Sequence, residues 1–90
     1  MKYVVFYQSP DEARAQAREH FPAHQAWYMS FRERGLLLMI GPFADAGTES
    51  AMAVFTTRDA AEEFVKGDPF VRNGVVRHWH IREWNEALVP

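Results

Sequence analysis

The chain has 90 residues, with 10 Lys and Arg against 12 Asp and Glu and a formal net charge of −2. This length argues for one domain over residues 1–90. The absence of cysteine excludes disulfides and thiolate nucleophiles. Because the charges are interspersed and there is no Lys/Arg run, we expect no nucleic-acid partner.

The apolar content bears on localisation and assembly. The first ten residues, MKYVVFYQSP, lack the apolar stretch and cleavage site of a signal peptide. No apolar run reaches the ~18 residues of a membrane span, so we expect a cytoplasmic protein without a membrane partner. Hydrophobic residues make up 48% of the chain and aromatic residues 14%. That is more than a lone small domain needs, and it predicts a homodimer or larger homo-oligomer.

The first half of the chain predicts a strand followed by helix. Residues Tyr3–Tyr7 (YVVFY) are β-branched or aromatic throughout, which is typical of a strand covered on both faces. Ser9 and Pro10 then suit a helix start, and the Ala-rich segment 11–20 predicts an exposed helix. Pro22 predicts the start of a new helix, which Gly35 ends.

The second half predicts two strands, a helix and a last strand. Residues Leu36–Phe43 and Ala51–Thr56 form the expected antiparallel pair, a helix opens at Thr57 and closes at Gly67, and Val75–Trp84 is the final strand. The order β-α-β-β-α-β is the split βαβ, ferredoxin-like pattern of an α+β fold with an antiparallel sheet. Its helices cover one face, so we expect the other apolar face to pack against a second subunit.

His24 is the first candidate for chemistry. With Pro22 as the first helical residue, His24 lies in the first turn, where the helix dipole disfavours a positively charged ring. A nearby carboxylate would favour that charge, and a histidine balanced between the two can move protons near neutral pH. The alternative is a histidine that packs against Trp27 and bonds a backbone carbonyl.

Asp68 is the second candidate. Because Pro69 follows it, its backbone should be extended, just beyond the end of a helix. A carboxylate is unfavourable at that end of the helix dipole. Two interpretations stay open: Asp68 bonds its own downstream backbone as a turn residue, or it orients the His24 ring through Nδ1. Phe70 of the same turn is a candidate substrate contact.

Gly41, Pro42 and Tyr28 are further candidates for substrate binding. Gly41 and Pro42 end a buried strand, and either they only terminate it or Gly41 lets a ligand approach the backbone closely. Tyr28 follows His24 by one helical turn. It could donate a proton or bond a phenolic substrate, although a tyrosine in this position more often only packs.

His78 and His80 alternate on one face of the last strand. Together with a third ligand such as His24 or His20 they could hold a metal ion. We favour the simpler interpretation, in which there is no metal and His78 forms a wall of the His24 pocket or is an ordinary polar side chain.

Four segments resemble the YciI-like (YCII-related) family. They are PAHQAWY at residues 22–28, RGLLLMIGPF at 34–43, TTRDAAEEF at 56–64 and GDPFVRNGV at 67–75. The resemblance covers nearly the whole chain. It departs from many relatives after Phe43, because only residues 44–50 precede the next strand.

The resemblance implies a dimeric α/β barrel of ferredoxin-like subunits with a His–Asp pair in a pocket, here His24 and Asp68. The chemical precedent in that family removes chloride from a chlorinated hydroxyhydroquinone by acid–base elimination. The leading hypothesis is therefore a cofactor-independent lyase or isomerase that acts on a small aromatic or lactone-like molecule. The alternative is a non-catalytic ligand-binding or accessory module of the same fold.

Overall fold

The computed structural model describes residues 1–45 and 47–88, and the β-α-β-β-α-β order predicted from the sequence is confirmed. The elements in chain order are β1 (Lys2–Gln8), η1 (Asp11–Ala13), α1 (Arg14–Glu33), β2 (Leu37–Pro42), β3 (Ala51–Phe55), α2 (Arg58–Gly67), α3 (Pro69–Arg72) and β4 (His78–Trp84). No helix within these described ranges is long and apolar enough to cross a membrane.

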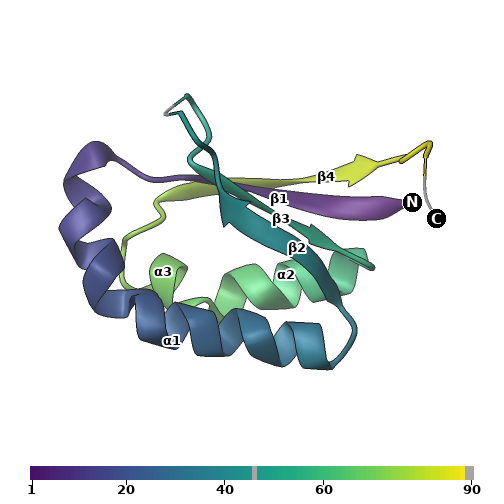
Figure 1. Ribbon diagram of the computed structural model, residues 1–90, viewed down its shortest axis with the longest axis horizontal. Helices are drawn as coiled ribbons and strands as arrows, with labels where there is room; N and C mark the ends of the chain where they lie inside the picture. Colours follow the sequence, from purple (N-terminus) through teal and green to yellow (C-terminus); the bar gives the residue numbers. More distant parts are fainter. Residues whose placement is uncertain (46, 89–90) are drawn as a thin grey trace.

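The four strands form one antiparallel sheet in the order β2-β3-β1-β4. The three α-helices all lie on one side of it (Figure 1). In register, Val5 on β1 pairs with Ala53 on β3 and with Ile81 on β4. Since side chains alternate along a strand, Val5 and Tyr7 face the helices while Val4 and Phe6 face away from them.

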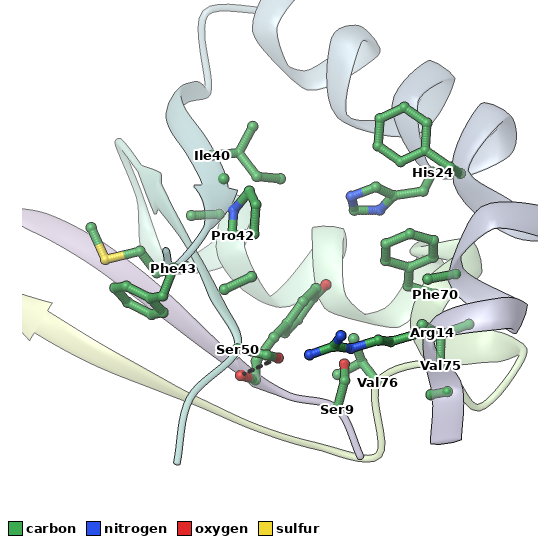
Figure 2. Close-up of a pocket in the computed structure, with 18 of the residues that line it drawn as sticks. Ser9, Arg14, His24, Ile40, Pro42, Phe43, Ser50, Phe70, Val75 and Val76 are labelled. Carbon is green, nitrogen blue, oxygen red and sulfur yellow. Dashed lines mark hydrogen bonds between the residues drawn. The ribbon is translucent and has the colours of Figure 1, made fainter. Parts of the chain in front are cut away.

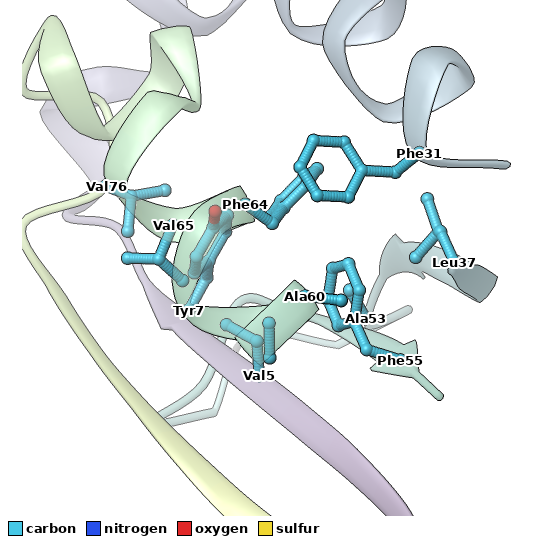
Figure 3. Close-up of a cluster of buried hydrophobic side chains, with 11 residues drawn as sticks. Val5, Tyr7, Phe31, Leu37, Ala53, Phe55, Ala60, Phe64, Val65 and Val76 are labelled. Atoms are coloured by element: carbon cyan, nitrogen blue, oxygen red, sulfur yellow. The ribbon is translucent and has the colours of Figure 1, made fainter. Parts of the chain in front are cut away.

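The core between the sheet and the helices is built around three phenylalanines. Phe31, Phe55 and Phe64 are fully buried, and the Phe64 ring centroid lies 5.2 Å from that of Phe31 and 5.0 Å from that of Phe55. Figure 3 shows these rings between β3, α1 and α2, with Tyr7 beside them. Burial of each such side chain contributes about 1.5–3 kcal/mol, so this cluster fixes the helices against the sheet.

Two of the helix boundaries follow local rules. Thr57 caps α2, with its side chain accepting a hydrogen bond from the Ala60 amide at 3.1 Å. Gly35, just after α1, has φ of +74°, a value that glycine adopts without strain. Both ends were predicted from the sequence.

The helix break predicted at Pro22 is wrong. Helix α1 runs without interruption from Arg14 to Glu33, with Pro22 inside it. A proline in a helix loses one backbone hydrogen bond and crowds the preceding turn. Here the helix buries His24 and Phe31 in the domain interior, and tertiary packing of this kind supplies most of the stability of a helix in a protein. The helix start predicted at Ser9 and Pro10 is a short 3₁₀ turn without a side-chain cap.

A close approach of α1 to α2 sets the position of the site. The Trp27 indole NH donates to the Phe64 carbonyl at 3.0 Å. A Cβ atom placed on Gly67 would lie 2.3 Å from Cζ2 of Trp27, a distance that real Cβ atoms do not tolerate. Glycine at the end of α2 thus lets α1 come close enough for His24 to reach the residue that follows Gly67.

The face of the sheet that carries no helix is apolar on its two central strands, while β4 adds His78, His80 and Arg82 to it. The strand register places six apolar side chains on it: Val4, Phe6, Met39, Met52, Val54 and Trp84. Met39 is 57% exposed and Trp84 is 46% exposed.

Candidate active site

His24 and Asp68 form a buried pair between α1 and the α2–α3 junction. Nδ1 of His24 lies 2.7 Å from Oδ1 of Asp68. The two residues are 6% and 0% exposed, respectively. A buried charge is stable only when it is paired and hydrogen-bonded. The hydrogen bonds to the Asp68 carboxylate therefore decide whether this buried pair is stable.

Three donors converge on the Asp68 carboxylate. Oδ1 accepts from His24 and also from the Phe70 backbone amide at 3.0 Å. Oδ2 accepts from the Tyr7 hydroxyl at 2.5 Å. Asp68 has the expected extended backbone, with φ −63° and ψ 122°, and its side chain caps α3. It therefore fills both of the roles that the sequence left open: it starts the turn after α2 and it holds His24.

The His24 ring is also fixed by aromatic packing. The Phe70 ring stacks on it, with centroids 3.8 Å apart and an angle of 5° between the planes. Tyr28 and Phe64 lie nearly perpendicular to it, with ring centroids 5.2 Å and 6.4 Å from that of His24. With one ring nitrogen bonded to Asp68 and these rings around it, the imidazole has little freedom to rotate.

The hydrogen bonds assign the roles of the two ring nitrogens. Oδ1 of the Asp68 carboxylate accepts from the Phe70 amide, which can only donate. A carboxylate oxygen can only accept, so Nδ1 of His24 is the donor in its bond to the same oxygen. Burial, reinforced by the neighbouring Asp68 charge, raises the pKa of Tyr7 well above its usual range, so its hydroxyl remains a donor. In neutral His24 the lone pair then lies on Nε2, which can accept a proton.

His24 points into a mostly apolar cavity of about 610 Å³. Figure 2 shows its ring extending from α1 toward Ile40 and Pro42 of β2, with Phe70 stacked beside it. Arg14 lies at another part of the cavity, near Ser9 and Ser50. The cavity lies within the 300–1,000 Å³ range of small-molecule sites.

The helix-dipole argument for His24 does not apply. His24 lies in the interior of α1, and the dipole acts on the first and last turns only. Its surroundings are instead set by Asp68 and the aromatic rings.

Residues 1–85 match the profile of the YCII-related domain. The chain belongs to the YCII-related family. The family expected from the four sequence segments is confirmed.

Curated relatives of this YCII-related chain include Protein YciI of Escherichia coli and Protein YciI of Shigella flexneri. Each is 26% identical to it over 98 residues, covering 98% of this chain and 100% of the relative. Among solved structures, it is similar to 5-chloro-2-hydroxyhydroquinone dehydrochlorinase (TftG) from Burkholderia phenoliruptrix AC1100 in complex with 2,5-dihydroxybenzoquinone. The TM-score is 0.80 over 97% of this chain and 96% of that one, at 17% identity. At this identity the similarity confirms the ferredoxin-like α+β fold.

Four of the predicted substrate contacts in this YCII-related domain border the same cavity. Tyr28, Gly41, Pro42 and Phe70 all line it together with His24. A Cβ atom on Gly41 would meet nothing within 4 Å, so the glycine does not serve close packing. Because Gly41 pairs with Met52 in register, such a Cβ atom would point to the helix-free side of the sheet, and it is the Gly41 backbone that borders the cavity.

His78 does not form a wall of the His24 pocket, contrary to prediction. It pairs with Gln8 in register, and the strand alternation places it with Phe6 and His80 on the helix-free face. The His80 ring stacks on Phe6 with centroids 5.0 Å apart. Over residues 1–45 and 47–88, no cluster of three or more His, Cys, Asp or Glu side chains could hold a metal ion.

Tyr7 is the site residue that sequence reasoning missed. It lies in a strand interpreted as apolar on both faces. The available signal was its hydroxyl, because a polar group on a buried strand face needs a hydrogen-bond partner.

Proposed function

We propose that this protein is a small acid–base enzyme that catalyses elimination or isomerisation of a small, hydroxylated aromatic or lactone-like molecule. His24 is the proton-transferring group and Asp68 orients it. The observation that supports this most strongly is the buried pair: Nδ1 is bonded to the carboxylate at 2.7 Å, while the ring borders a cavity of ligand size.

In the proposed reaction Nε2 of His24 removes a proton from a C–H or O–H group of the substrate. The released electron pair forms a new C=C or C=O bond. In an elimination the bond to the leaving group breaks and the group departs as an anion. In an isomerisation the proton returns to a different atom. Asp68 stabilises the imidazolium that forms in between, without taking the proton itself.

The cavity walls support a flat, largely apolar substrate. Phe21 and Phe70 line it, and their ring centroids lie 6.5 Å apart. Aromatic side chains favour offset or edge-on contact with another ring. Membership of the YCII-related family and the fold shared with a dehydrochlorinase that binds 2,5-dihydroxybenzoquinone support the same substrate class.

The proposed working form is a homodimer in which two copies cover each other's helix-free sheet face. The support is the apolar character of that face, where Phe6 and Met52 lie on the two central strands. An uncovered apolar patch of this kind marks an interaction site in most soluble proteins.

The test is incubation with 5-chloro-2-hydroxyhydroquinone, with hydroxylated aromatics bearing other leaving groups, and with small lactones. Products are identified by mass spectrometry and released chloride by ion chromatography. Hydroxyhydroquinone without chlorine is the matched control substrate. We expect conversion of at least one compound by the wild type, and its loss in His24→Gln and Asp68→Asn.

Two outcomes oppose the proposal. Conversion that survives His24→Gln unchanged contradicts the role of His24. A compound that binds in the cavity and is recovered unchanged supports the alternative, a ligand-binding or accessory module.

A further inference from the structure

Tyr7 connects the sheet to the histidine on α1 through the Asp68 carboxylate. It is buried on β1, and its hydroxyl donates to Oδ2 of Asp68 at 2.5 Å. Figure 3 shows the hydroxyl at the tip of the ring, pointing away from β1 toward the helical layer. The hydroxyl thus reaches across the core to a residue 61 positions later in the chain.

The two carboxylate oxygens are held unequally. Oδ1 has two donors, Nδ1 of His24 and the amide of Phe70, whereas Tyr7 is the donor to Oδ2. Without the Tyr7 hydroxyl, Oδ2 would be a buried oxygen lacking that donor, which is costly. The carboxylate could relieve this by turning about its Cβ–Cγ bond, and Oδ1 would then leave its position opposite Nδ1.

We propose that Tyr7 is a positioning residue: its hydroxyl fixes the rotation of the Asp68 carboxylate, which in turn keeps the Nδ1 proton of His24 in place and Nε2 free for substrate. This proposal rests on the proposed acid–base function. The hydroxyl of Tyr7 acts on His24 only through Asp68, so it takes no part in the proton transfer itself.

The experiment compares wild type, Tyr7→Phe and Tyr3→Phe by long-range ¹H–¹⁵N NMR of the histidine rings, at a pH where His24 is neutral. Tyr3 is the matched control, because it lies on the same strand and the same face, with its hydroxyl on Glu83 at an exposed position. The spectra report directly which ring nitrogen carries the proton. Backbone ¹H–¹⁵N spectra check that each variant is folded.

We expect wild type and Tyr3→Phe to show one His24 tautomer, with the proton on Nδ1. In Tyr7→Phe the pattern should shift toward a mixture of the two tautomers, and any turnover found should fall in kcat with little change in KM. If Tyr7→Phe keeps the wild-type tautomer, the positioning role is overturned, even if the variant is less stable. If the wild type itself carries the proton on Nε2, the proposed function fails as well, so the two failures are distinguishable.

A second measurement uses only the wild type, so it tests the proposal even if Tyr7→Phe does not fold. The Tyr7 hydroxyl proton should exchange slowly with solvent and show a cross-peak to its own ring carbons, while the Tyr3 hydroxyl proton exchanges too fast to be seen. A Tyr7 hydroxyl that exchanges as fast as that of Tyr3 would overturn the proposal.

Discussion

Nδ1 of His24 and Oδ1 of Asp68 lie 2.7 Å apart, although 44 positions separate the two residues in the chain. Two features of the fold bring them together: α1 approaches α2 at Gly67, and the chain turns sharply at Pro69. The carboxylate is fully buried and bonded to donors on β1, α1 and α3. The position of the Asp68 carboxylate therefore depends on three separate elements of the domain.

Replacement of His24 by Gln should abolish most of any activity. General acid–base catalysis contributes typically ~10²–10⁴-fold, so turnover of a confirmed substrate should fall by about that factor. His20→Gln is the control, because His20 lies on the same helix but does not line the cavity. Steady-state kinetics of both variants are the measurement, and equal rates in wild type and His24→Gln would contradict the assignment.

Replacement of Tyr7 by Phe should destabilise the fold. The change leaves Oδ2 of the buried Asp68 without its hydroxyl donor, and an unsatisfied buried polar group costs ~1–3 kcal/mol, more for a charged one. Urea denaturation at pH 7 measures the free energy of unfolding. Tyr3→Phe, whose hydroxyl bond is exposed, should change it by less than the Tyr7 substitution does.

The same tyrosine predicts a loss of stability at high pH. Burial raises the pKa of Tyr7 in the folded protein above its value of 10.0 in the unfolded chain. The folded state therefore keeps a proton that the unfolded state loses, so this contribution is fully present below about pH 10 and declines above it. Unfolding measured at several values above pH 9 should show a steeper decline in wild type than in Tyr7→Phe.

A pair of glycine substitutions tests the approach of α1 to α2. Gly67→Ala would place a Cβ atom 2.3 Å from the Trp27 ring, and overpacking of this kind typically costs about 1–3 kcal/mol. Gly41→Ala meets no atom within 4 Å and should leave the melting temperature nearly unchanged. Equal melting temperatures for the two variants would show that Trp27 moves aside freely.

The proposed homodimer can be tested on the helix-free face. Met52→Glu places a charge on β3, one of the two central strands of the sheet. Light scattering should give twice the 10.4 kDa chain mass for wild type and a monomer for Met52→Glu. Phe21→Glu, on the opposite side of the sheet, is the control and should stay dimeric. A monomeric wild type would contradict the proposed assembly.

Much of the fold could be predicted from the sequence because its signals are local. The strand at residues 51–55, the Thr57 cap and the positive φ at Gly35 follow from β-propensity, side-chain capping and glycine freedom. Pro22 was misinterpreted because the contacts that decide its place in the helix are not local. Its local preference for a helix start is overridden by the tertiary packing of α1, which buries His24 and Phe31.

The site was only partly predictable. His24 and Asp68 were identified from the family resemblance together with the Asp-Pro turn. Tyr7 could not be assigned, because its partner is remote in sequence and strand patterns do not reveal hydrogen bonds across a core. His78 was misplaced, because the face it occupies depends on the register of β4 against β1, which the sequence leaves open.

The most direct test of the central claim is long-range ¹H–¹⁵N NMR of the His24 ring in wild type and in Asp68→Ala. If the carboxylate orients the ring, wild type should carry the proton on Nδ1 and leave Nε2 free, and Asp68→Ala should show a mixture of the two tautomers. If the two proteins show the same tautomer pattern, Asp68 does not orient His24, and the acid–base function proposed for this site is contradicted.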